Sequence, residues 1–139
     1  MIRHWLPVVV YIALIFAVSS IHGDQLPGLF PKGDKVGHLL EYLLLGLLLG
    51  RAIRFTLAGR SSMVAATATV AAGAAVGVLD ELYQSRIPGR FSDPADCLVD
   101  VAAVLAAVLF TRFVHVRPLW KGHRADGGGR KTDVETLPR

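Results

Sequence analysis

The sequence predicts an all-α integral membrane protein, built as a bundle of four spanning helices. Of its 139 residues, 53% are hydrophobic and only 19% are charged, and the mean hydropathy is +0.47. This composition is more apolar than that of an ordinary soluble domain. The apolar residues occur in long blocks separated by turn-forming or charged segments. Blocks of this kind indicate helices whose outer faces contact lipid.

The first block covers residues 6–21 and follows Arg3, His4 and Trp5. It is short for a span, which needs about 20 residues. A basic start and the tripeptide Ala17-Val18-Ser19 are also typical of a cleaved signal peptide. We expect an uncleaved helix, and keep cleavage as the alternative.

The second block follows a connector, residues 22–33, that is rich in glycine and proline. Asp34 is expected to cap a helix over residues 35–54. Gly46 and Gly50 are spaced as a GxxxG pair, which permits close approach of a neighbouring helix.

The third helix is expected to begin with a cap at Ser61 or Ser62 and to run to about residue 84. It carries a second pair of small residues, Gly73 and Gly77. The dipeptide Pro88-Gly89 then interrupts helical structure.

The fourth helix is predicted to begin at the sequence Asp93-Pro94, a capping acid followed by proline at the first helical position. It is expected to run to about residue 114. Residues 1–117 therefore form the predicted four-span domain. Residues 118–139 contain three consecutive glycines and many charges, and are predicted to be a basic, disordered tail. The single Cys97 allows no intramolecular disulfide.

Basic residues predict the orientation of the chain. They cluster before the first helix, in the loop after the second helix and in the tail. Lysine and arginine accumulate on the cytoplasmic side of membrane proteins, so both termini are expected in the cytoplasm. The segments 22–34 and 80–96 are then extracytoplasmic. The charge of +4 and the pI of about 9.6 do not indicate nucleic-acid binding, because the basic residues lie at helix ends.

Polar residues recur with helical spacing near the predicted outer ends of three helices. Charge near hydrocarbon is costly and is usually functional. Helical periodicity places each set on one face, so we predict one shared polar pocket at the outer end of the bundle. Its predicted ligand-binding residues are Lys35, His38, Tyr42, Asp80, Glu81, Gln84, Arg90, Asp96 and Asp100. Asp93 is interpreted as a structural cap, and Arg86 as a charge facing lipid headgroups.

The same residues resemble a known family. Asp34-Lys35, His38 and Tyr42, followed by Asp80-Glu81, Gln84, Arg90 and Asp96, resemble the VanZ-like family of small bacterial membrane proteins, as does Ser19-Ser20. The chain departs from the family pattern at Asp100, where asparagine is more usual, and at Ala103, where glycine is common. The resemblance covers residues 6–109 and implies a multi-pass protein of the bacterial cytoplasmic membrane. It also implies a link to the cell envelope and to teicoplanin resistance, but no particular reaction.

Three functions remain open on the sequence. The first is an accessory or binding module for an anionic, phosphate-bearing lipid or a lipid-linked envelope precursor. The second is a membrane-embedded enzyme, with His38, Glu81 and Asp96 as candidate catalytic residues and a cation as one variant. The third is a polar network that only fixes helix packing. No HExxH or similar spacing occurs, so no metal or cofactor is assigned. Membrane lipids are the expected partners, and the sequence predicts no oligomeric state.

Overall fold

The computed structural model describes residues 1–22, 33–90 and 93–113, and for residues 33 and 34 it describes the backbone alone. These segments contain four helices: α1 (Ile2–Ser19), α2 (Gly33–Thr56), α3 (Ser62–Gln84) and α4 (Pro94–Phe113). All regular secondary structure in the described ranges is helical. The predicted all-α fold with four helices is therefore confirmed. The predicted tail at 118–139 and most of the connector at 22–33 lie outside the described residues.

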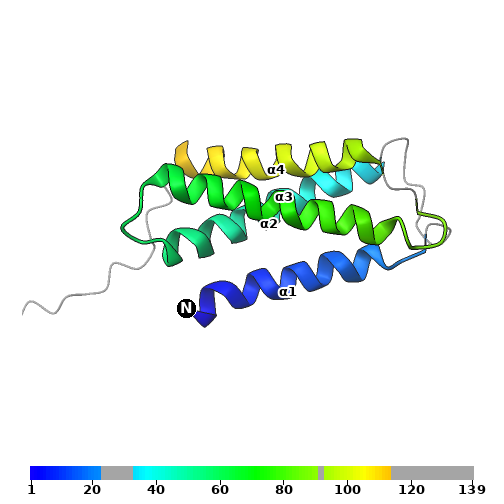
Figure 1. Ribbon diagram of the computed structural model, residues 1–139, viewed down its shortest axis with the longest axis horizontal. Coiled ribbons are helices and arrows are strands. Elements are labelled where there is room, and N and C mark those ends of the chain that lie inside the picture. The colour runs from blue at the N-terminus through cyan, green and yellow to red at the C-terminus, as the bar shows by residue number, and fades with distance from the viewer. Residues whose placement is uncertain (23–32, 91–92, 114–139) are drawn as a thin grey trace, which may run out of the picture.

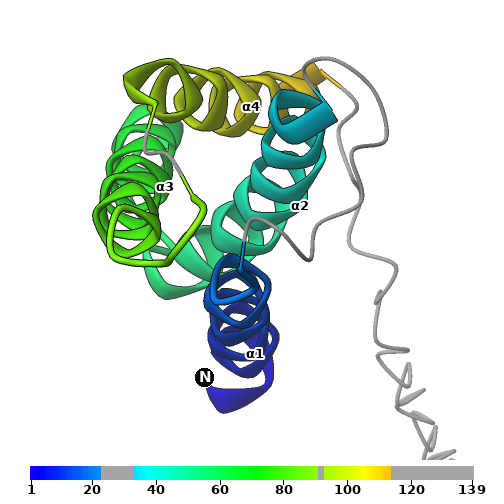
Figure 2. The ribbon, with the colours of Figure 1, turned by 90° about the vertical axis from the view of Figure 1, so that its right-hand side faces the viewer.

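Consecutive helices run antiparallel, so two ends of the bundle can be distinguished (Figure 1). The end of α1, the start of α2, the end of α3 and the start of α4 meet at one end, which we call the polar end. Figure 2 shows α2, α3 and α4 side by side around the bundle axis, with α1 against α2 and α3. Among the described helices α1 does not contact α4. Three helices therefore surround the interior, and α1 covers one side of it.

All four helices are long and apolar enough to cross a membrane. Their outward faces expose large apolar side chains, for example Leu6, Leu40, Leu82 and Leu98. A soluble protein of this size rarely exposes so continuous an apolar surface. A surface of this kind is compatible with a bundle that spans a membrane.

Two of the predicted helix caps are present. The Ser61 hydroxyl accepts the backbone N–H of Val64 at 3.3 Å. Asp93 Oδ1 accepts the N–H of Ala95 at 2.9 Å, immediately before α4. α2 begins at Gly33, two residues before the predicted first helical residue, and the expected capping side chain of Asp34 lies outside the described side chains. A difference of this size is within the one or two residues by which helix ends vary.

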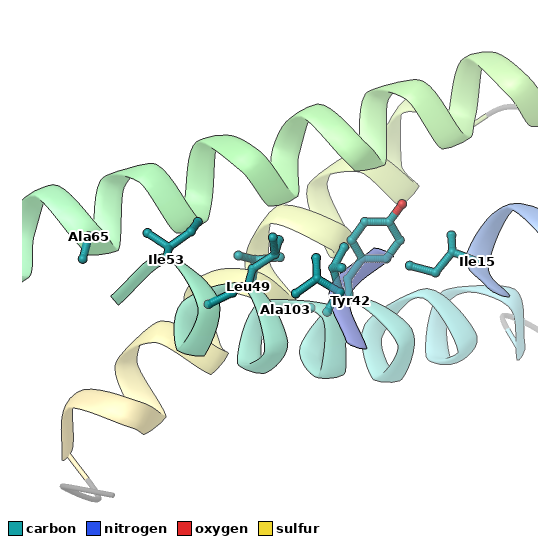
Figure 3. Close-up of a cluster of buried hydrophobic side chains, with 10 residues drawn as sticks. Ile15, Tyr42, Leu49, Ile53, Ala65 and Ala103 are labelled. Atoms are coloured by element: carbon teal, nitrogen blue, oxygen red, sulfur yellow. The ribbon is translucent and has the colours of Figure 1, made fainter. Parts of the chain in front are cut away.

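The apolar core lies between the helices along the length of α2. Tyr42, Leu45 and Leu49 are at most 2% exposed. Figure 3 shows Tyr42 and Leu49 pointing from α2 into the space between the helices. Glycine allows close contacts with α4, since an added Cβ at Gly46 would lie 2.8 Å from the Cβ of Ala107. Gly46 therefore faces α4 closely, as a close-approach motif predicts, whereas a Cβ on Gly50 would lie 3.7 Å from Thr69 of α3.

Candidate functional site

Lys35 joins the start of α2 to the start of α4. Its Nζ donates to Asp93 Oδ2 at 2.8 Å and to Asp96 Oδ1 at 2.7 Å. The hydrogen bond from Lys35, together with that from the Ala95 N–H, holds the pKa of Asp93 below its usual value. Asp93 thus acts both as the cap of α4 and as a partner of Lys35. The Lys35 ammonium thus already donates hydrogen bonds to two carboxylates.

His38 connects α2 to the two other helices that surround the interior. Its Nδ1 lies 3.0 Å from Asp100 Oδ1 of α4, and its Nε2 lies 4.0 Å from Glu81 Oε1 of α3. Glu81 Oε2 in turn accepts the backbone N–H of Asp93 at 3.1 Å. His38, Glu81 and Asp100 are 7%, 4% and 0% exposed, so these groups interact in the interior of the bundle.

Asp80 and Gln84 extend this network to α1. Gln84 Nε2 donates to Asp80 Oδ2 at 3.0 Å and to Ser19 Oγ at 3.1 Å. The Tyr42 hydroxyl donates to the same Asp80 oxygen over a longer distance, 3.5 Å. Helical spacing did not place Ser19 in the site. The only signal for it was the serine pair that ends an otherwise apolar block.

Gly77 makes room for Asp100. A Cβ built on Gly77 would lie 2.9 Å from Asp100 Oδ2 and 3.3 Å from Asp100 Cβ. The backbone of α3 therefore lies directly against the carboxylate. Asp100 Oδ2 is fully buried and has no hydrogen-bond partner among the described residues.

Arg90 is placed by a tight turn between α3 and α4. Its backbone N–H donates to Ile87 O at 3.1 Å, and Gly89 has a left-handed backbone with a φ of 73°. Proline followed by such a glycine is the sequence signature of a type II β-turn. The Arg90 side chain is half-buried, and its Nε has no hydrogen-bond partner in the described part of the chain. The neighbouring Arg86 is exposed.

The structure thus brings most of the predicted site residues together at the polar end, in a group that we call the polar cluster. Its members are Lys35, His38, Tyr42, Asp80, Glu81, Gln84, Asp96 and Asp100. Asp93 links Lys35 to Glu81, and the stacked rings of His38 and Tyr42 join the remaining parts. Arg90 lies in the adjacent turn. A role in ligand binding stays a prediction for each of them. The cluster is acid-rich and its carboxylates are almost completely buried. Lys35 and Arg90 are more exposed and form its rim.

A small cavity lies at the opposite end of the bundle. Along α2, Gly50 is about 18 Å from His38 at the standard helical rise, so this cavity is separate from the polar cluster. The residues that line it are Gly50, Arg54, Ser62, Ala65, Ala66, Thr69, Val108, Thr111 and Arg112. It contains basic and hydroxyl groups but no acid.

Comparisons with protein-family models, with curated proteins and with solved structures found no match.

Proposed function

We propose that this chain is a VanZ-like integral membrane protein of the bacterial cytoplasmic membrane, with both termini in the cytoplasm. Its polar end binds the phosphate of an anionic lipid or of a lipid-linked envelope precursor on the extracytoplasmic side. Four long apolar helices support membrane insertion. The pattern of residues around Lys35, His38 and Arg90 supports the family.

The binding proposal rests on the missing hydrogen-bond partner of the Arg90 side chain among the described residues. Its Nε is buried, yet it has no hydrogen-bond partner among the described residues. A buried donor without a partner costs about 1–3 kcal/mol, and more when the group is charged. A phosphate oxygen at the rim would accept this hydrogen bond. Arginine suits that role because its planar fork matches phosphate geometry.

The distribution of charge makes Arg90 the principal anion contact. Lys35 already donates to Asp93 and Asp96, so its charge is largely neutralised within the protein. The interior behind the rim is acidic and repels a second anion. A single headgroup phosphate at the rim, with the lipid chains along the helices, is the arrangement that this charge pattern favours.

The test is a titration of the full-length protein in detergent with a polyprenyl phosphate, read as a shift in thermal unfolding. Replacing Arg90 with alanine is expected to weaken binding roughly 10–100-fold, the value of one or two charge-assisted hydrogen bonds. Arg86→Ala is the matched control, because Arg86 is an exposed arginine in the same loop. A titration with phosphatidylglycerol shows whether an ordinary membrane lipid is sufficient.

The proposal fails if wild type and Arg90→Ala respond equally to the phosphate lipid. It also fails if neither protein responds, because Arg90 would then bind no lipid phosphate. A larger loss in Arg86→Ala than in Arg90→Ala would assign the anion to the exposed loop instead.

A further inference from the structure

The imidazole of His38 has one nitrogen fixed and the other directed toward carboxylates. Nδ1 lies 3.0 Å from Asp100 Oδ1, so the N–H of the neutral ring is best placed on Nδ1. The lone pair is then on Nε2, which faces Glu81 Oε1 at 4.0 Å. Two hydrogen-bond acceptors facing each other in a buried region repel unless a proton on the imidazole or a metal ion lies between them.

A third carboxylate completes this arrangement. One ligand atom from each of His38, Glu81 and Asp96 lies within 4.8 Å of the others, and all three residues are buried. Metal–ligand bonds of about 2.0–2.2 Å place the ligand atoms of a tetrahedral ion roughly 3.4 Å apart. Closing the present spacing to that value needs side-chain movements of about 1 Å, which small rotations supply.

His38, Glu81 and Asp96 form hydrogen bonds with neighbouring groups, as the ligands of a metal site usually do. A metal-binding histidine usually donates its other N–H to a carboxylate, and Asp100 is in that position. Lys35 holds Asp96 through Oδ1 at 2.7 Å, and the N–H of Asp93 holds Glu81 through Oε2 at 3.1 Å. Each of these hydrogen bonds uses one oxygen of Asp96 or Glu81, and each carboxylate has a second oxygen.

The charge of the region also favours a cation. Among the described residues, Lys35 pairs with Asp93 and Asp96. Asp80 instead contacts Gln84 and Tyr42, and Asp100 contacts His38. Asp100 is 0% exposed, and its Oδ2 has no hydrogen-bond partner in the described ranges. Uncompensated buried carboxylates are costly, and a bound divalent ion offsets that cost.

We propose that His38 Nε2, Glu81 and Asp96 bind one divalent transition-metal ion, with Asp100 as a positioning residue. One imidazole and two carboxylates suit Zn²⁺ or Mn²⁺ better than Mg²⁺, which prefers oxygen ligands. Three protein ligands leave a coordination position open. The site is independent of the phosphate-lipid proposal, since it uses different residues.

The experiment is metal loading of the purified full-length protein. The protein is stripped with a chelator, loaded with Zn²⁺, Mn²⁺ or Mg²⁺, passed over a desalting column and assayed by elemental analysis. We expect about one Zn²⁺ or Mn²⁺ per chain and little Mg²⁺, as an imidazole ligand favours transition ions. His38→Gln and Asp96→Asn should each abolish retention. Asp100→Asn should weaken it about 10–100-fold, the usual effect of an outer contact.

Matched controls separate this site from the rim. Asp93→Asn removes a neighbouring carboxylate that is outside the proposed ligands and should retain the ion, as should Arg90→Ala. If the ligand variants do not fold, Co²⁺ absorption in the wild-type protein still tests the site, because imidazole and carboxylate coordination gives visible d–d bands. The proposal is overturned if the wild type retains no transition ion, or if His38→Gln and Asp96→Asn retain it as well as the wild type does.

Discussion

Asp100 shows how one residue depends on its neighbours across two helices. It lies about 9 Å into α4 at the standard rise, far enough that its charge needs compensation. His38 supplies a hydrogen bond from α2, and Gly77 of α3 supplies space. The sequence predicted that this aspartate would need a partner. It did not predict that the glycine stripe of α3 would lie directly over the carboxylate.

Replacing Gly77 with alanine should destabilise the bundle. The added Cβ would lie 2.9 Å from Asp100 Oδ2 and 3.3 Å from Asp100 Cβ, and a fully buried side chain has little room to move. Overpacking of this kind costs about 1–3 kcal/mol. Equilibrium unfolding in mixed micelles measures the change.

Gly37→Ala is the matched control for this substitution. Gly37 lies in α2 and has nothing within 4 Å of an added Cβ. Alanine there should be neutral or should stabilise the helix by about 0.5–1 kcal/mol. If the two variants unfold alike, Asp100 moves aside freely and the close fit has no energetic role.

At the scale of the helices, the sequence predicted most of what the structure contains. Long apolar blocks indicated the four helices, and the caps at Ser61 and Asp93 followed from short-range chemistry. The predicted start of α2, residue 35, lies two residues after the observed start at Gly33. Residue periodicity also indicated which face of α3 points inward, since Gly73, Gly77, Glu81 and Gln84 are all buried.

The start of α4 should respond to substitution of Asp93 in two separable ways. Asp93→Asn keeps a capping oxygen for the Ala95 N–H but removes the charge that pairs with Lys35. Asp93→Ala removes both interactions, so its unfolding temperature should fall further than that of the asparagine variant. Thermal unfolding of the three proteins at neutral pH measures this order.

The dependence on pH adds a second measurement for Asp93. Its pKa in the folded protein lies below the usual value of 3.8, so its stabilising contribution is complete above pH 3.8. That contribution is lost as the pH falls through the lowered pKa, because the carboxylate then binds a proton. Asp93→Asn should be less sensitive to acid in this range. An unchanged acid sensitivity would mean that the Lys35 pairing contributes nothing measurable, as for many exposed ion pairs.

For the whole molecule, sequence and structure agree on the convergence of polar residues and differ in how open the site is. Spacing predicted that α2, α3 and α4 would place their polar residues together, and they do. A pocket was expected, but His38 and the acids of the polar cluster are 0–7% exposed. Periodicity reports which face of a helix points inward, and it carries no information on how closely the helices approach. Small residues such as Gly46 and Gly73 decide that distance through their contacts with α4.

The orientation of the bundle in the membrane is a prediction that the arrangement of charges makes testable. Arg3, Arg51, Arg54, Arg60 and Arg112 lie at or near the end opposite the polar cluster. An excess of arginine near helix ends marks the cytoplasmic side. The turn before Arg90 is then extracytoplasmic, where it reaches lipid headgroups from outside the cell.

Single cysteines in a Cys97→Ser background test this orientation. Pro88 and Ala58 are both exposed and lie in connections at opposite ends of the bundle. A membrane-impermeant maleimide added to intact cells should label Pro88→Cys and leave Ala58→Cys unlabelled until the cells are broken. The reverse pattern would place the polar cluster beside the cytoplasmic leaflet. Its anionic ligand would then have to be a cytoplasmic one, because the rim around Arg90 would face the cell interior.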